Sequence, residues 1–151
     1  MRRYFADIEI PIQEGSTIFL DIDGTLLGDS EQEVAPETAW EVQNLAKNNR
    51  VLLISNNKDK KRNEAIAKNL KVEYLFTSYK KPDKKILQDV PHLETHSIYV
   101  IGDKLLVDGL FAKNIGAQFI QVKRVRAKKE SMRNTLFYLV DDTLSLFSRF
   151  L

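Results

Sequence analysis

Residues 17–25 read TIFLDIDGT, an apolar run followed directly by two aspartates and a glycine. The run at 17–20 is short and continuously apolar, which is typical of a strand buried on both faces of a parallel sheet. Asp21 and Asp23 follow at the point where such a strand would end. Carboxylates in this position repel each other and lose hydration, so they need a compensating charge. The sequence therefore predicts a strand with a charged site at its carboxyl end.

The rest of the chain alternates between strand and helix patterns. Similar apolar runs lie at 51–54, 74–76, 97–101 and 118–122. Helical patterns lie at 36–46, 58–70, 82–90 and 107–114, and Trp40 is expected to pack in the first of them. Strands that alternate with helices imply right-handed crossovers and a doubly wound, Rossmann-like α/β fold with three layers. Such folds bind ligands at the carboxyl ends of their strands.

The composition suits one ordinary domain. The chain has 151 residues, of which 43% are hydrophobic and 29% charged, enough to bury a single core. We expect one domain over 1–151, with its core at about 16–123 and a basic segment and C-terminal helix at about 123–151. The absence of cysteine excludes disulfides and thiolate chemistry. A net charge of +2 gives no general attraction to nucleic acid, so no nucleic-acid binding is expected.

The sequence also bears on location. Its first residues lack the apolar segment of a signal peptide. No apolar run approaches the roughly 20 residues that a membrane span needs. We therefore expect a cytoplasmic protein, with peripheral contact to a membrane left open.

Four predicted strand ends carry polar side chains suited to one site. In chain order they are Asp21 with Asp23, Ser55 with Asn56, Lys81, and Asp103 with Asp108. The carboxyl ends of parallel strands meet at one edge, so these groups should converge. Two carboxylates about 4 Å apart repel by roughly 4 kcal/mol near a protein surface, and Lys81 alone cannot balance four of them. Ligands that are all oxygen favour a hard cation, most simply Mg²⁺.

The same crevice is suited to a phosphoryl group. Ser55 offers a hydroxyl, and the backbone N–H groups after Asp21 and Ser55 lie at turns that can cradle an anion. A bound Mg²⁺ usually keeps an open position for a phosphate oxygen. Phosphoryl transfer needs mainly positioning and charge stabilisation, and an aspartate can carry the phosphate covalently.

These segments resemble the motifs of the haloacid dehalogenase-like (HAD) phosphatases. The matching segments are DIDGTL at 21–26, LLISNN at 52–57, KKPDKK at 80–85 and IGDKLLVD at 101–108, in the family's order. The resemblance implies that Asp21 is the nucleophile and forms an aspartyl-phosphate. It implies that Asp23 first protonates the leaving oxygen and then activates water. The second aspartate favours a phosphatase, because the dehalogenases lack it.

The resemblance also assigns the substrate-binding positions. Ser55 and the backbone N–H of Asn56 would hold phosphate oxygens. Lys81 would balance the charge of the nucleophile and the phosphate. Gly24 and Thr25 would form and brace the turn after the nucleophile and belong to the same substrate-binding set.

The implied metal site draws on the same motifs. Asp103 would bind Mg²⁺ together with Asp21 and the main-chain carbonyl of Asp23. Asp108 would orient these ligands.

The spacing of the motifs leaves no room for a cap domain. The stretches between Asp21 and Ser55 and between Ser55 and Lys81 hold little more than one helix each. An open site implies either a homo-oligomer that covers it or a bulky substrate. Within the family, the motifs look most like the capless branch related to the phosphatidylglycerophosphate phosphatases, with Lys104 and Val107 at its variable positions.

Several readings of the substrate remain open at this point. Lipid phosphates, sugar phosphates, nucleotides and phosphoproteins all fit the motifs. The alternative of another class is a non-catalytic module that binds phosphoryl groups or docks a partner. Intact Asp21 and Asp23 argue against that alternative.

The C-terminal region adds two features. KRVRAKK at 123–129 could meet an anionic membrane or a second substrate phosphate, although a solvated loop is the simplest reading. An apolar stripe follows at helical spacing, formed by Met132, Leu136, Val140, Leu144, Phe147 and Leu151. We expect this stripe to pack on its own domain, with a partner chain or a membrane as alternatives.

Overall fold

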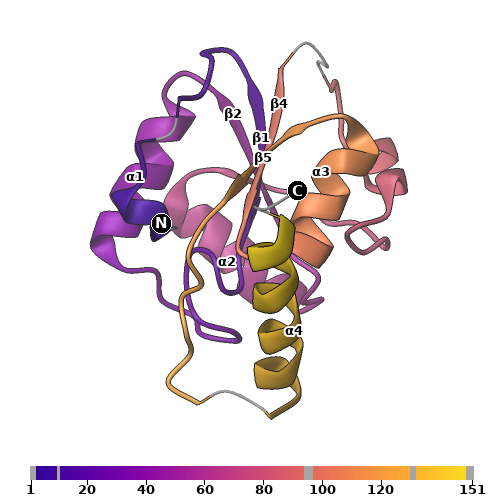
Figure 1. The fold of residues 1–151 in the computed structure, drawn as a ribbon. Coiled ribbons are helices and arrows are strands. Elements are labelled where there is room, and N and C mark those ends of the chain that lie inside the picture. The colour runs from indigo at the N-terminus through magenta and orange to yellow at the C-terminus, as the bar shows by residue number, and fades with distance from the viewer. Residues whose placement is uncertain (1–2, 10, 94–96, 130–131, 149–151) are drawn as a thin grey trace.

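The computed structural model describes residues 3–9, 11–93, 97–129 and 132–148. Five strands form one parallel sheet in the order β3-β2-β1-β4-β5 (Figure 1). Their bounds are β1 Thr17–Asp21, β2 Arg50–Ile54, β3 Glu73–Tyr74, β4 Ile98–Gly102 and β5 Gln118–Gln121. The sheet confirms the doubly wound Rossmann-like class, and the described residues include no separate cap.

Helices cover both faces of this sheet. The α-helices are α1 Pro36–Ala46, α2 Lys60–Leu70, α3 Leu110–Ile115 and α4 Met132–Ser148. Shorter turns of helix lie at η1 Phe5–Asp7, η2 Lys84–Asp89 and the π-helical η3 Leu105–Gly109. Each expected strand and helix region therefore has a counterpart, although η2 is a 3₁₀ turn and β3 has only two residues.

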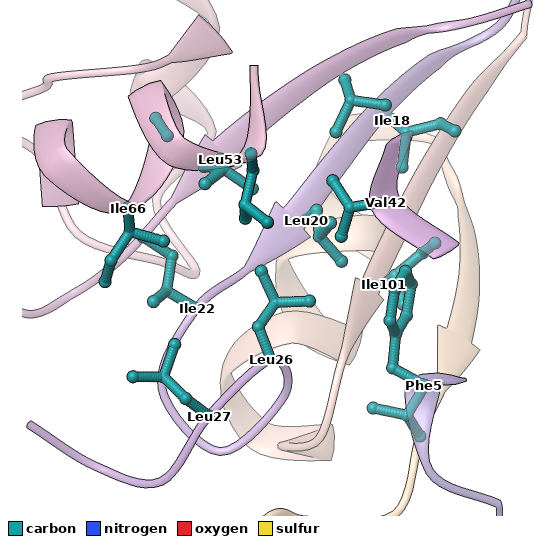
Figure 2. Packing of buried hydrophobic residues seen from close by; sticks show 14 of the residues in the cluster. Phe5, Ile18, Leu20, Ile22, Leu26, Leu27, Val42, Leu53, Ile66 and Ile101 are labelled. Atoms are coloured by element: carbon teal, nitrogen blue, oxygen red, sulfur yellow. The ribbon is translucent and has the colours of Figure 1, made fainter. Parts of the chain in front are cut away.

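The core has one cluster on each face of the sheet. Ile18 and Leu20 of β1 pack with Val42 of α1 and Ile66 of α2 (Figure 2). Phe19, between them in sequence, points to the other face and meets Phe111 of α3 edge to face, with 5.6 Å between ring centroids. Alternate residues of a strand face opposite sides, so a continuously apolar β1 is what a buried central strand requires.

The expectation for Trp40 is wrong, because its side chain is 64% exposed. Thr38 and Val42 are the buried residues of α1. Residues four apart share a helix face, whereas a residue two away points elsewhere. The position between Thr38 and Val42 therefore turns Trp40 to solvent.

The expected packing of the C-terminal stripe is also wrong for the residues that the structure describes. Met132, Leu136 and Phe147 are each more than 60% exposed. The buried residues of α4 are instead Tyr138, Asp141 and Ser145. Leu151 lies outside the described residues. The helix forms where expected, but its polar side faces the domain.

Candidate active site

The strand register brings the predicted site residues to one edge of the sheet. Asp21 ends β1 and pairs in register with Ile54, the residue before Ser55. Leu20 pairs with Ile101, so Asp103 lies beyond the neighbouring end of β4. A cavity of about 280 Å³ opens at this edge, and Asp21, Asp23, Ser55, Asn56 and Lys81 all line it.

A buried ion triad forms the floor of the site. Lys81 Nζ lies 2.6 Å from Asp21 Oδ1 and 2.5 Å from Asp108 Oδ1. Burial alone would raise the pKa of Asp21, but the charges of Lys81 and Lys104 outweigh it and lower that pKa. Burial would lower the pKa of Lys81, yet Asp108 and Asp21 hold it above its usual value. The Asp21 carboxylate is therefore kept charged inside the protein.

The fourth motif places two more carboxylates next to Asp21. Burial, followed by the charge of Asp21, raises the pKa of Asp108 despite its ion pair with Lys81. Burial also raises the pKa of Asp103 well above its usual value, even though Lys104 lies 3.2 Å away. Among the described residues, Asp103 Oδ2 finds no hydrogen-bond donor. The three carboxylates of Asp21, Asp103 and Asp108 therefore face only two ammonium groups in the described site, those of Lys81 and Lys104.

The acid group fits a divalent cation. Ligand oxygens of Asp21, Asp103 and Asp108 all lie within 4.8 Å of one another. Lys104 Nζ donates to the main-chain oxygen of Asp23 at 3.0 Å and to Asp103. The ammonium of Lys104 thus takes a position among the oxygens that a hard cation would bind. The unpaired Asp103 Oδ2 is the observation that most directly favours a further cation.

The turn after β1 allows these groups to approach closely. Gly24 has a φ of +86°. A Cβ atom at this position would lie 2.5 Å from Asp103 Oδ2 and 2.9 Å from the Tyr138 hydroxyl, so only glycine fits. Thr25 Oγ1 donates to Asp21 Oδ2 at 3.2 Å, which braces the carboxylate from the loop.

Asp23 is held by three residues, of which Ser30 donates its backbone N–H to Oδ1 at 3.0 Å. The Arg62 guanidinium binds both carboxylate oxygens, with Nη2 at 2.7 Å from Oδ1 and Nη1 at 3.1 Å from Oδ2. Ser55 Oγ donates to the Asp23 carboxylate at 3.0 Å, and the Asn57 N–H donates to that same Oγ. Asp23 therefore has a fixed orientation at the wall of the cavity.

Asn56 connects two of the predicted motifs. Its side-chain oxygen accepts from the Lys81 N–H at 2.8 Å, and its Nδ2 donates to the Lys81 carbonyl at 3.0 Å. This pair of bonds holds the Lys81 backbone beside the loop after β2. The neighbouring Lys80 is exposed, so the structure selects Lys81 from the pair as the residue that faces the acids.

Sequence reasoning missed Arg62 and passed over Lys104 as a variable position. Arg62 lies four residues before Ile66 on the buried face of α2. An arginine on the apolar face of a helix predicts an ion pair, because a buried arginine needs a carboxylate partner. Lys104 gave no such signal, since its contacts depend on the π-helical turn that follows it. Asn134 and Phe137 of α4, which also line the cavity, could not be placed from sequence.

The parallel sheet with acids at its edge is the architecture of the HAD-like class. More specifically, the chain belongs to the family described as mitochondrial PGP phosphatase, whose model matches residues 3–125. The family is one of HAD-like phosphatases, whose members are enzymes, and it implies a divalent metal. No curated protein sequence matches this chain.

Two solved structures are similar to this chain at low sequence identity. A chain of the Pnkp1/Rnl/Hen1 complex has a TM-score of 0.51 and 14% identity, over 83% of this chain and 51% of that one. A chain of the Pnkp1/Rnl/Hen1 RNA repair complex has a TM-score of 0.49 and 15% identity, over 77% of this chain and 44% of that one. The present chain therefore spans about half the length of these relatives, and the first likeness supports the fold alone.

Proposed function

We propose that the protein is a Mg²⁺-dependent phosphomonoester hydrolase that acts through an aspartyl-phosphate on Asp21. The observation that carries this proposal is the pairing of Asp21 with Lys81, which keeps a buried carboxylate charged at the floor of an open cavity. A charged oxygen is the form that attacks phosphorus. Asp23, at the wall of the same cavity, supplies a second carboxyl for proton transfer.

The reaction takes two steps. An Asp21 oxygen attacks phosphorus, the bond to the leaving oxygen breaks, and Asp23 gives its proton to that oxygen. Asp23 then takes a proton from water, whose oxygen attacks phosphorus and breaks the bond to Asp21. Inorganic phosphate leaves, and both aspartates return to their starting states. Arg62 fixes Asp23 for both transfers, and Lys81 balances the charge at Asp21.

Asp21, Asp103 and the main-chain carbonyl of Asp23 would hold the Mg²⁺. The cation supplies positive charge to the phosphoryl oxygens as they accumulate negative charge. Asp108 positions the site, because its Oδ2 accepts from the Lys104 N–H at 3.1 Å while Oδ1 meets Lys81. Lys104 donates to oxygens of Asp23 and Asp103, so it would compete with the cation for them.

Phosphatidylglycerophosphate is the substrate that we propose. The name of the family supports this choice, and the open cavity without a cap suits a headgroup presented by a larger assembly. In the part of the chain that the structure describes, no helix has the length and apolar character to cross a bilayer. The cytoplasmic location expected from the sequence stays a prediction, and the family's mitochondrial description names a second compartment to test.

Phosphate release from micellar phosphatidylglycerophosphate should require Mg²⁺. Excess EDTA should lower the rate at least about a hundredfold, because the acid group then lacks the cation that stabilises transferred charge. Excess Mg²⁺ should restore it. The kcat/KM for the lipid should exceed that for soluble sugar phosphates. Metal-independent turnover would refute the metal proposal, and a preference for small sugars would refute the lipid.

Arg62→Gln should lower kcat for p-nitrophenyl phosphate by about tenfold or more, because Asp23 loses its bidentate partner. Arg62→Lys should give an intermediate rate, since an ammonium cannot bind both oxygens in the same plane. Lys61→Gln is the matched control, because this neighbour on α2 is exposed. Steady-state kinetics on folded variants measure this effect. An unchanged kcat in Arg62→Gln would show that Arg62 does not contribute to the proposed reaction.

A further inference from the structure

Helix α4 is attached to the domain by its polar side. Its buried or half-buried residues are Asn134, Tyr138, Asp141 and Ser145, which recur at helical spacing along one narrow stripe. Asn134 Nδ2 and the Tyr138 hydroxyl both donate to the Asp29 carboxylate, at 2.8 and 2.9 Å. The first half of the helix is therefore held to the domain by hydrogen bonds to Asp29.

The second half of the stripe continues in the same way. Asp141 accepts from the N–H groups of Leu105 and Leu106, at 2.9 and 2.7 Å. Ser145 Oγ bonds to Gln121 Oε1 at 3.1 Å. Asp141 is 1% exposed, so its carboxylate is turned into the protein and away from any surface that α4 would contact. Asp142 is adjacent to this attached stripe on the helix.

The opposite side of α4 is apolar and exposed. Its exposed large side chains are Met132, Leu136, Phe137, Leu139, Val140, Leu144, Leu146 and Phe147. Their spacing places them on one broad face away from the attached stripe, with Arg133 the charged residue among the described members of that face. A contiguous exposed apolar face of this kind marks a binding surface.

The chain that leads into α4 carries exposed cations. Lys123, Arg126, Lys128 and Lys129 are exposed on the segment that leads from β5 to α4. The segment has a defined path, because the Lys123 N–H donates to the Arg3 carbonyl at 2.7 Å and the Val125 N–H donates to the Gly24 carbonyl at 2.8 Å. Exposed lysines and arginines on the segment that leads into an apolar helix complement an anionic lipid surface.

The surface also adjoins the cavity. Phe137, on the exposed side of α4, lines the same cavity as Asp21. Figure 1 shows α4 beside the sheet and extending beyond it, with the basic segment running out from β5. A lipid whose phosphate enters the cavity would therefore have its acyl part close to the apolar face.

We propose that the exposed face of α4 and the cations at 123–129 dock the enzyme on an anionic phospholipid bilayer, with the cavity at headgroup level. The proposal rests on the proposed lipid phosphatase function. A lipid surface fits better than a second copy of the chain. A symmetric dimer would bring the same patch of both copies together and place their basic segments near one another.

Vesicle sedimentation tests the proposal without any turnover. The Asp21→Asn variant should bind vesicles of mixed phosphatidylglycerol and phosphatidylcholine far more tightly than phosphatidylcholine alone. Adding Leu136→Gln, Leu139→Gln and Val140→Gln should weaken binding about a hundredfold or more, because three exposed apolar side chains no longer enter the lipid. Trp40→Gln is the matched control, since Trp40 is as exposed but lies on α1.

The triple glutamine change leaves the attached stripe intact, so circular dichroism and the melting temperature should match the parent. With Asp21 restored, its kcat for soluble p-nitrophenyl phosphate should stay within about twofold, whereas kcat/KM for vesicle-borne substrate should fall with binding. Undiminished binding by the triple variant, or no binding by the parent, would overturn the proposal. The proposal would also fail if the parent were a dimer that the triple change dissociates, while vesicle binding stayed the same. If the wild-type protein bound vesicles but hydrolysed no phosphate substrate, the proposed function would be refuted and the docking proposal would stand.

Discussion

Asp21→Asn is expected to lower kcat for p-nitrophenyl phosphate by at least about a thousandfold, because the amide cannot form the covalent phosphate linkage. The fold should survive, since Lys81 keeps Asp108 as an ion partner and asparagine has nearly the same shape. Asp7→Asn removes the same charge from an exposed position on η1 and should match the wild type. Stopped assays of phosphate release at saturating Mg²⁺ give the comparison.

A second variant separates loss of the nucleophile from general damage. Asp23→Asn should still allow attack on p-nitrophenyl phosphate, whose leaving group needs no proton, but should slow the attack of water. Acid quenching after a short reaction should then trap labelled phosphate on Asp23→Asn and none on Asp21→Asn. Mass spectrometry would place the label at Asp21. Label on neither variant would contradict the aspartyl-phosphate mechanism.

The sheet and the convergence of the motif residues could be predicted because both follow from local sequence. A continuously apolar run such as residues 17–20 must be buried on both faces, and parallel pairing then brings Asp21, Ser55 and Asp103 to one edge. Lys81 could be chosen over Lys80 from its place before Pro82, and the structure turns it toward Asp21 and Asp108. The metal and the roles of these residues stay predictions.

The remaining features depend on contacts between distant segments. Arg62 meets Asp23 only after α2 packs on the sheet, and Lys104 reaches the Asp23 carbonyl only through the turn at η3. The orientation of α4 was predicted wrongly because an apolar stripe usually marks the buried face. In α4 the polar side faces the domain instead, because the Asp141 carboxylate accepts hydrogen bonds from two N–H groups of η3.

Lys81→Met should destabilise the protein as well as inactivate it. The change leaves the buried Asp21 and Asp108 facing each other without the ammonium between them. Lys81 and Asp108 are almost fully buried, so the loss in the free energy of unfolding should be about 3–5 kcal/mol in EDTA. Lys80→Met is the matched control, because Lys80 is exposed and should cost little.

The pH dependence and a double variant identify the cause. Without Lys81, burial should raise the pKa of Asp21 and Asp108 in the folded state above the unfolded values. A carboxyl whose pKa is raised by folding stabilises the folded state at low pH, and this stabilisation is lost as the pH rises through the folded-state pKa. The loss in the free energy of unfolding of Lys81→Met should therefore be larger near about pH 8 than near about pH 5. Lys81→Met/Asp108→Asn removes one charge and should regain much of the stability at the higher pH, as measured by urea unfolding. Its kcat should stay as low as that of Lys81→Met, because Asp21 still lacks the Lys81 ammonium. A double variant no more stable than the single one would show that lost packing, rather than unpaired charge, explains the defect.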